Sequence, residues 1–228
     1  MLNNLENTGS EINKNNILNK SFRNLFHDNF KAKKIHSDPT IVELSNFLNP
    51  NEISFILDFG KNKFTRSQVV ENDKLVSSDT RTSNTAYLTD NGHKKKYPKV
   101  FELIIEKVKA LTGFSRNYIE NIMLVKYQKG QHFYDHHDYF KEKDVNILKN
   151  GGQRIATFFI WLNTVNPSNC GETEFPLINL KKSPVAGNGL FWWNKKNGKM
   201  LNKTLHRGNH VKNGEKYGLN IWIREKGW

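Results

Sequence analysis

The sequence predicts a single domain of the α+β class, mainly β, in which two helices pack on an antiparallel sandwich or jelly roll. Two observations indicate this class. The two clear helical patterns lie before residue 114, whereas from Ile122 onward the chain consists of short β-rich runs separated by polar or glycine-containing turns. Because no helical pattern alternates with those runs, we do not expect βαβ units or a doubly wound sheet. The length of 228 residues suits one well-cored domain.

The first 35 residues differ in composition from the rest of the chain. They are rich in Asn, Lys and Ser with scattered apolar residues, so they bury little surface on their own. We therefore expect residues 1–35 to form a mobile or loosely docked arm and residues 36–228 to form the main domain, with folding proper starting near Ile41.

The first helix is predicted in NPNEISFILDFG, residues 49–60, by signals at both of its ends. Asn49 suits the N-cap, Pro50 the first helical position and Glu52 the first turn. Gly60 is expected to stop the helix.

The second helix is predicted in YPKVFELIIEKVKALTG, residues 97–113, by six apolar residues at helical spacing. Gly113 follows the last of them, as expected where a helix ends. The six apolar residues are Val100, Phe101, Ile104, Ile105, Val108 and Leu111.

Four later runs predict strands, because each is short and rich in β-branched and aromatic residues. The runs are IMLVKYQ (122–128), RIATFFIWLN (154–163), GLFWWN (189–194) and YGLNIWIRE (217–225). The C-terminal half of the chain is therefore expected to be mostly sheet.

Composition limits the cellular compartment and the binding partners that we expect for this protein. The 35 Lys and Arg against 22 Asp and Glu give a net charge of +13, which attracts nucleic acids, acidic proteins or small anions. Since many lysines are dispersed, we interpret the charge as a solvated surface and not as a nucleic-acid footprint. The single cysteine, Cys170, excludes an internal disulfide framework. No run resembles a signal peptide or a membrane span, so we expect a soluble, cytoplasmic protein without a membrane partner.

A candidate metal site lies in HFYDHHDYF, residues 132–140. If this stretch is extended, alternate side chains share a face, so His136 and Asp138 point together. One imidazole and one carboxylate leave a divalent ion under-coordinated, so a third ligand must come from a distant strand, with His206 and His210 as candidates. Two histidines and one carboxylate on one triangular face hold non-haem Fe(II) and leave the opposite face open. The alternative is an ordinary polar surface.

Lys216 is a second unusual residue, because it heads a run in which Leu219, Ile221 and Ile223 share one face. A lysine inside such a sheet is costly unless an anion pairs with it, and a bound dicarboxylate would supply that anion. The alternative is that Lys216 caps the strand in water.

These segments together resemble the prolyl 4-hydroxylase branch of the Fe(II)/2-oxoglutarate dioxygenases, from about Ile41 to Glu225. The resemblance implies a double-stranded β-helix, or jelly-roll, core with supporting N-terminal helices. The motifs that carry it are YQKGQHFYDHHD (127–138), RIATFFIWLN (154–163), GETEFP (171–176), SPVAGNGLFWWN (183–194) and HRGNHVKNGEKYGLNIW (206–222).

The resemblance implies a ligand set and a cosubstrate pocket. Fe(II) is expected to bind His136, Asp138 and His206. His206 is preferred over His210 because the family's lysine follows the third ligand by ten positions, as Lys216 does here. That lysine is implied to bind the distal carboxylate of 2-oxoglutarate. The residues implied to bind 2-oxoglutarate are Lys216, Tyr127, Thr173 and Trp222.

A peptide substrate is implied by RTSNTAYL, residues 81–88, which resembles the loop that covers the substrate in this branch. Aromatic faces suit proline rings, and Phe140 and Trp192 are further candidates for such a groove, with core packing as the alternative. The residues expected at the substrate are Arg81, Ser83, Arg154, Tyr139 and Trp193. The aromatics expected in the core are Phe158, Phe159, Trp161 and Phe191.

The sequence departs from the family pattern at three positions without losing a ligand. Cys170, His210 and Tyr217 stand where the family has glycine, proline and tryptophan. The run KEKDVNILKNGGQ, residues 141–153, is irregular in length, which points to altered substrate access. The residues interpreted as surrounding the ligands or facing solvent are His132, Asp135 and His137, with His132 at a strand edge on the surface.

The resemblance implies a procollagen-proline 4-dioxygenase-like enzyme that uses Fe(II), 2-oxoglutarate and O2, binds L-ascorbate, and converts peptidyl proline to 4-hydroxyproline with release of succinate and CO2. Its partner is a proline-containing peptide or protein. The alternatives are the same chemistry on peptidyl lysine or nucleic acid, and a catalytically silent binding module. Sequence alone does not determine the protein substrate, the choice between collagen-like repeats and a single proline, or the oligomeric state.

Overall fold

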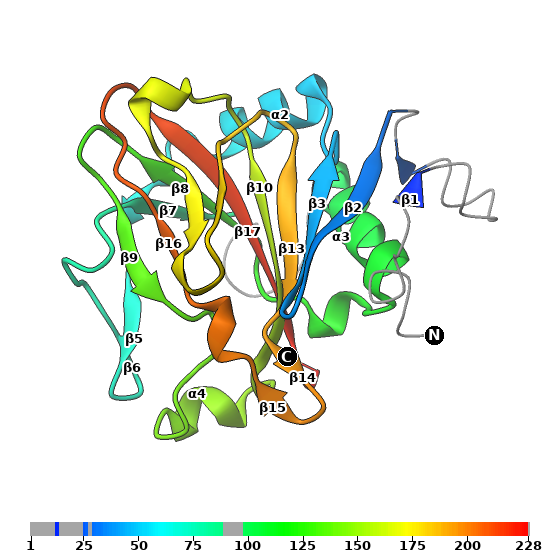
Figure 1. The fold of residues 1–228 in the computed structure, drawn as a ribbon, viewed down its shortest axis with the longest axis vertical. Coiled ribbons are helices and arrows are strands. Elements are labelled where there is room, and N and C mark those ends of the chain that lie inside the picture. Colours follow the sequence, from blue (N-terminus) through cyan, green and yellow to red (C-terminus); the bar gives the residue numbers. More distant parts are fainter. Residues whose placement is uncertain (1–11, 14–24, 27–28, 89–97, 228) are drawn as a thin grey trace.

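Two antiparallel sheets face each other, and two helices cover the outer face of the larger sheet (Figure 1). The computed structural model describes residues 12–13, 25–26, 29–88 and 98–227. This architecture confirms the mainly β, jelly-roll-type fold that the sequence predicts, with α2 (Pro50–Gly60) and α3 (Lys99–Thr112) as the supporting helices.

The strands of both sheets come from distant parts of the chain. The larger sheet contains β1 (Ile12–Asn13), β2 (Lys31–Ser37), β3 (Thr40–Ser45), β4 (Thr65–Arg66), β7 (Asn84–Tyr87), β8 (Met123–Tyr127), β10 (Arg154–Trp161), β13 (Gly189–Trp193) and β17 (Lys216–Arg224). The smaller sheet contains β9 (Phe133–His136), β11 (Thr173–Phe175), β12 (Leu180–Lys182) and β16 (His206–Gly208). Their orders are β1-β2-β3-β13-β10-β17-β8-β7-β4 and β12-β11-β16-β9. Each of the four predicted strand runs is confirmed, as β8, β10, β13 and β17.

Two hairpins and several short helices complete the described part of the chain. The hairpins are β5 (Val69–Glu71) with β6 (Lys74–Val76), and β14 (Lys195–Lys196) with β15 (Lys199–Met200). The short helices are α4 (Val145–Lys149), η2 (Arg116–Tyr118), η3 (Pro167–Asn169), η4 (Pro176–Ile178) and η5 (Asn202–Thr204). Figure 1 places the tip of the β5–β6 hairpin near α4, below the two sheets.

The helix signals act as predicted at both ends of α2 and at the end of α3. Asn49 caps α2 in a capping box, accepting from Glu52 N at 2.8 Å while the Glu52 carboxylate accepts from Asn49 N at 2.8 Å. Gly113 ends α3 in the left-handed region at φ 82°. Gly60 is the last residue of α2, so the helix stops where predicted. A Cβ at Gly60 would lie 2.3 Å from Leu124 Cδ2, so glycine allows α2 to approach β8 closely.

The ordered core begins earlier than Ile41. Strand β2 starts at Lys31 and pairs with β3, and the side chains of Phe30 and Ala32 are fully buried. Long-range pairing recruits this polar segment into the sheet, which its composition does not reveal. The predicted arm of residues 1–35 otherwise falls largely outside the described residues.

Strand alternation divides the interior into two cores. Between the larger sheet and the helices lie residues such as Phe158 and Phe191, whereas between the two sheets lie their chain neighbours Phe159 and Trp192. Adjacent residues of one strand therefore serve different layers. The prediction that four aromatic residues pack in the core is confirmed. These residues are Phe158, Phe159, Trp161 and Phe191.

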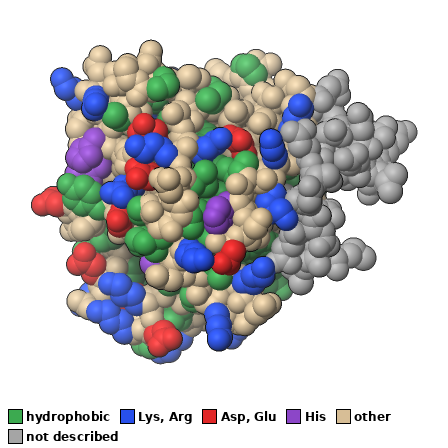
Figure 2. Space-filling view, in the orientation of Figure 1, with side chains coloured by type: hydrophobic (Ala, Val, Ile, Leu, Met, Phe, Trp, Pro, Cys, Tyr) green, Lys and Arg blue, Asp and Glu red, His purple; other side chains and the backbone are tan. Residues whose placement is uncertain are grey.

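The surface shows mixed charge. Figure 2 shows Lys and Arg side chains interspersed with Asp and Glu over one face of the protein, not gathered into one patch. None of the helices in the described ranges is both long and apolar enough to cross a membrane.

Candidate functional site

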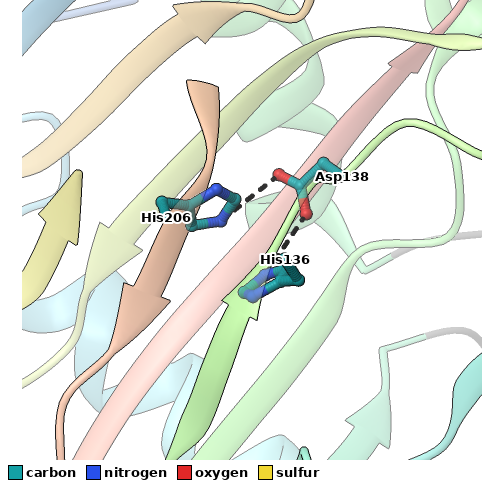
Figure 3. Close-up of side chains that lie close together, drawn as sticks. All are labelled: His136, Asp138 and His206. Carbon is teal, nitrogen blue, oxygen red and sulfur yellow. Dashed lines mark ion pairs between the residues drawn. The ribbon is translucent and has the colours of Figure 1, made fainter. Parts of the chain in front are cut away.

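The pairing of β9 with β16 brings three candidate ligands together. His206 lies opposite His136 in this pair, and Asp138 follows two residues after β9 ends (Figure 3). The Asp138 carboxylate lies 3.8 Å from each Nε2, with Oδ1 facing His136 and Oδ2 facing His206. One nitrogen or oxygen from each of the three residues falls within 4.8 Å of the others. His210, the alternative candidate, is not part of this cluster.

The two imidazoles suit a divalent cation because their free nitrogens converge. His136 Nδ1 lies 2.8 Å from the Tyr134 carbonyl, and His206 Nδ1 lies 3.0 Å from the Thr204 carbonyl. A carbonyl only accepts, so each Nδ1 carries the proton and each Nε2 keeps its lone pair for a metal. Burial lowers the pKa of both histidines, that of His136 far below its ordinary value, which keeps the rings neutral.

A buried chain of hydrogen bonds holds the Asp138 carboxylate. Trp192 Nε1 donates to Asn194 Oδ1 at 3.0 Å, Asn194 Nδ2 donates to Thr157 Oγ1 at 3.0 Å, and Thr157 Oγ1 donates to Asp138 Oδ2 at 2.7 Å. An indole can only donate, so the direction of every bond in the chain is fixed. Burial by itself would raise the pKa of Asp138, but the two imidazoles and this hydrogen bond lower it.

The same chain connects two members of the cluster. The Trp192 ring packs edge-on against His206, with 4.9 Å between centroids, while its indole nitrogen starts the chain that ends at Asp138. Thr157, Asn194 and Trp192 are all at most 1 % exposed. Sequence reasoning missed the roles of Thr157 and Asn194, because a short polar side chain in a strand run gives no local sign of its distant partner.

Lys216 lies in a pocket beside the three clustered residues. It is 1 % exposed, and desolvation lowers its pKa from 10.5 to about 7, with Glu172 acting weakly in the opposite direction. Its Nζ lies 5.2 Å from the Tyr127 ring centroid and 5.3 Å from that of Phe159. Among the described residues no carboxylate forms an ion pair with Lys216, so the buried amine has room for an anionic ligand.

The four residues expected around the cosubstrate all line this pocket. Tyr127 and Thr173 are 4 % exposed, and Lys216 and Trp222 lie on the same face of β17. Asn220, between the last two, also lines the pocket and was missed, although alternation from Lys216 indicates its direction. The site therefore combines residues from β8, β11 and β17.

A groove of about 400 Å³ adjoins the pocket, and three of the five expected substrate residues line it: Arg81, Arg154 and Tyr139. The Arg154 guanidinium stacks 3.6 Å from the Trp222 ring centroid and pairs with Glu120 at 2.7 Å. Arg81 donates through Nε to Ser83 at 3.3 Å, and its buried NH2 group has no partner among the described residues.

The other two expected substrate residues lie elsewhere. Ser83 is fully buried in a hydroxyl cluster with Ser67, at 2.8 Å, and contacts the groove-lining Arg81 from behind. Trp193 lies in the core on the helix side of β13, because its neighbour Trp192 takes the face toward the site. Phe140 does line the groove, as the aromatic hypothesis predicts.

His132 was expected at the surface, and this is wrong. It is 9 % exposed, its ring lies 4.4 Å from that of His210, and its Nε2 lies 3.2 Å from the Asp79 carbonyl. Its backbone N–H donates to Thr82 Oγ1 at 2.8 Å, so His132 fastens the 79–82 loop to the start of β9. Asp135 is exposed, and His137 is half-buried.

Comparisons with known proteins agree with this arrangement. The family model described as the 2OG-Fe(II) oxygenase superfamily matches residues 122–224. Prolyl 4-hydroxylase 1 of Arabidopsis thaliana is 29 % identical over 214 residues, which cover 87 % of this chain and 73 % of the relative. A putative prolyl 4-hydroxylase of Acanthamoeba polyphaga mimivirus is 30 % identical over 80 % of this chain and 73 % of its own length.

Longer relatives and solved structures also match. Prolyl 4-hydroxylase subunit alpha-3 of Homo sapiens is 32 % identical over 86 % of this chain, but the match spans only 36 % of that subunit. The viral collagen prolyl hydroxylase of Paramecium Bursaria Chlorella virus-1, solved as a 2OG complex, superposes with a TM-score of 0.63 at 24 % identity. That superposition covers 81 % of this chain and 95 % of the viral protein, and it establishes a shared fold.

Proposed function

The chain belongs to the prolyl 4-hydroxylase-like branch of the 2OG-Fe(II) oxygenase superfamily, and we propose that it hydroxylates peptidyl proline at C4, consuming 2-oxoglutarate and O2 and releasing succinate and carbon dioxide. It is thus a 2-oxoglutarate-dependent oxidoreductase. One observation carries the proposal: the His136, Asp138 and His206 cluster shares a pocket with a buried lysine that forms no ion pair among the described residues.

Fe(II) would be held by Nε2 of His136 and His206 and by the carboxylate of Asp138. When bound with 2-oxoglutarate, iron supplies the activation of O2 that breaks a proline C–H bond. The chain's own part is to keep both imidazoles neutral through burial and to fix the carboxylate through Thr157.

The distal carboxylate of 2-oxoglutarate would pair with Lys216, and hydroxyls of Tyr127 and Thr173 would add hydrogen bonds. A hydrogen bond to a charged group contributes about 1.5–3 kcal/mol. Trp222 and Phe159 form apolar walls of the same pocket, which exclude water from the ion pair and strengthen it.

The groove would hold the peptide in an extended conformation. Proline-rich segments have no internal hydrogen bonds, so their carbonyls are free to accept from an arginine that lines the groove, Arg81 or Arg154. Tyr139 and Phe140 offer aromatic faces to proline rings, and Arg154 orients Trp222 between the groove and the pocket.

Succinate release from 2-oxoglutarate with Fe(II) tests the function, measured with proline-rich peptides, lysine-containing peptides and single-stranded DNA in parallel. Mass spectrometry should find one added oxygen on proline, and turnover stimulated by DNA alone would reject the peptide proposal. Omission of L-ascorbate from the same assay tests the further proposal that sustained turnover requires this reductant.

A further inference from the structure

The β5–β6 hairpin forms one wall of the peptide groove and depends on contacts outside the main sheets. Val69, Val70, Glu71 and Leu75 line the groove from the hairpin, opposite the 137–141 segment. Within the described residues its two strands pair only with each other. A two-stranded hairpin is marginally stable by itself, so something else must hold this wall in position.

Reciprocal hydrogen bonds tie the hairpin tip to the irregular 141–153 segment. The Asp73 carboxylate accepts from the backbone N–H groups of Asn146, at 2.8 Å and 3.0 Å, and of Ile147, at 3.0 Å. In return, Asp144 Oδ1 accepts from Asp73 N at 3.1 Å. Lys143 adds a bond from Nζ to Asn72 Oδ1 at 2.8 Å. We call the paired Asp73 and Asp144 contacts the hairpin latch.

The hairpin turn presents Asp73 to its partner. Asn72 and Asp73 have φ values of 49° and 66°, so both central residues of the turn are left-handed, as in the two-residue turns that suit hairpins. Asn and Asp tolerate this region better than other residues with a Cβ. The turn sequence therefore gives both the hairpin and the carboxylate that fastens it.

The partner segment is itself anchored to the core. Gln153 brackets Phe140, accepting from its N–H at 2.9 Å and donating to its carbonyl at 2.8 Å. Arg224 donates to the carbonyls of Ile147, at 2.9 Å, and of Asn150. Arg224 also pairs with Glu120, which binds Arg154 beneath the groove. The latch thus joins the hairpin to a fixed base and not to a free loop.

We propose that Asp73 and Asp144 are positioning residues that set the width of the peptide groove by latching the β5–β6 hairpin against the 141–153 segment. This inference rests on the proposed function for the identity of the groove's ligand. A latched hairpin is already in the orientation that binds an extended peptide, so the competent state is fully populated before the substrate arrives. The latch touches neither the metal cluster nor Lys216, so it acts on peptide binding alone.

Substitution of Asp73 and of Asp144 by asparagine affects different hydrogen bonds of the latch. Asp73→Asn keeps Oδ1 as an acceptor for both N–H groups, but it replaces Oδ2, which accepts from Asn146 N at 2.8 Å, with an NH2 donor. Asp144 uses Oδ1 for Asp73 N and Oδ2 for Lys141 N, so Asp144→Asn loses one of the two bonds. We therefore expect Asp73→Ala to open the latch, and Asp73→Asn and Asp144→Asn to weaken it.

The experiment compares these variants with Asp58→Ala, a matched loss of one aspartate on α2, where the one ion pair of Asp58 within the described residues is with exposed Lys61. Hydrogen exchange of residues 69–76 should accelerate most in Asp73→Ala, less in Asp73→Asn, and remain as in the wild type in Asp58→Ala. The KM for a proline-rich peptide should rise roughly tenfold in Asp73→Ala, equivalent to about 1.4 kcal/mol, if the competent fraction falls tenfold. The KM for 2-oxoglutarate should not change.

The readouts separate the two proposals. Unchanged exchange at the hairpin in Asp73→Ala, or an unchanged or lower peptide KM, would overturn the latch. Wild-type protein that hydroxylates no proline peptide would overturn the proposed function, while hydrogen exchange would still report whether Asp73 holds the hairpin.

Discussion

Binding of 2-oxoglutarate should weaken as the pH rises, because the amine that would receive its distal carboxylate is neutral above its pKa. Lys216 has a pKa of about 7 in the cofactor-free protein, since burial disfavours its charged form. A dicarboxylate that pairs with it restores a pKa far above 7. Binding therefore requires uptake of a proton at any pH above about 7.

The size of the effect follows from this pKa. If only the charged amine binds, the apparent Kd equals the Kd of the charged form multiplied by the factor 1 + 10^(pH − 7). Between pH 6 and pH 9 the affinity should fall roughly ninetyfold, or about 2.7 kcal/mol. At pH 8 roughly 0.9 proton should be taken up for each molecule bound. The histidines contribute little to this window, because burial lowers the pKa of both.

Titration calorimetry of 2-oxoglutarate into the Mn(II)-loaded protein measures both quantities, with proton uptake read from buffers of different ionisation enthalpy. Pyruvate, which lacks the distal carboxylate, is the matched control and should bind with little pH dependence over the same range. In the Lys216→Met variant the pH dependence should disappear and 2-oxoglutarate should bind at least roughly tenfold more weakly at pH 6, equivalent to about 1.4 kcal/mol. A flat Kd for the wild type between pH 6 and pH 9 would refute the role of Lys216.

Three further predictions follow from the same contacts. Thr157→Val should weaken Mn(II) binding by about 10–100-fold, because Asp138 loses its hydrogen bond, whereas Thr157→Ser should restore it; equal affinities in calorimetry would contradict the buried chain. Gly218→Ala should cost about 1–3 kcal/mol in urea unfolding, since the new Cβ would lie 2.4 Å from Phe159 Cζ, and it should also weaken 2-oxoglutarate binding by pushing that ring into the pocket. Lys216→Met should stabilise the cofactor-free protein most below pH 7, because the unfolded lysine, with a pKa of 10.5, binds more protons than the folded one, so wild-type stability rises with pH between about 7 and 10.5. The lowered pKa corresponds to about 5 kcal/mol, so unfolding free energies that do not differ between variant and wild type at pH 6 would argue against a buried charge.

Sequence alone determined the features whose signals are local. The capping residues Asn49 and Glu52 define the start of α2, because a capping box forms between residues three positions apart. Short runs of β-branched and aromatic residues locate β8, β10, β13 and β17. The resemblance to the family's motifs singled out His136, Asp138, His206 and Lys216, which the structure brings to one pocket.

Only the tertiary structure decided which face of each strand meets the site and which distant groups meet there. Trp192 and Trp193 are adjacent tryptophans in the same strand run, and the sequence does not show which face of the sheet each one takes. The placement of β13 turns Trp192 toward His206 and Trp193 into the core on the helix side. The partners of Thr157 are 19 and 37 positions away, so no local pattern reveals its bond to Asp138. The low pKa of Lys216 arises from burial by elements far along the chain. The local backbone conformation depends on neighbours within a few residues. The sheet face that a side chain takes, its burial and its hydrogen-bond partners depend on packing against distant parts of the chain.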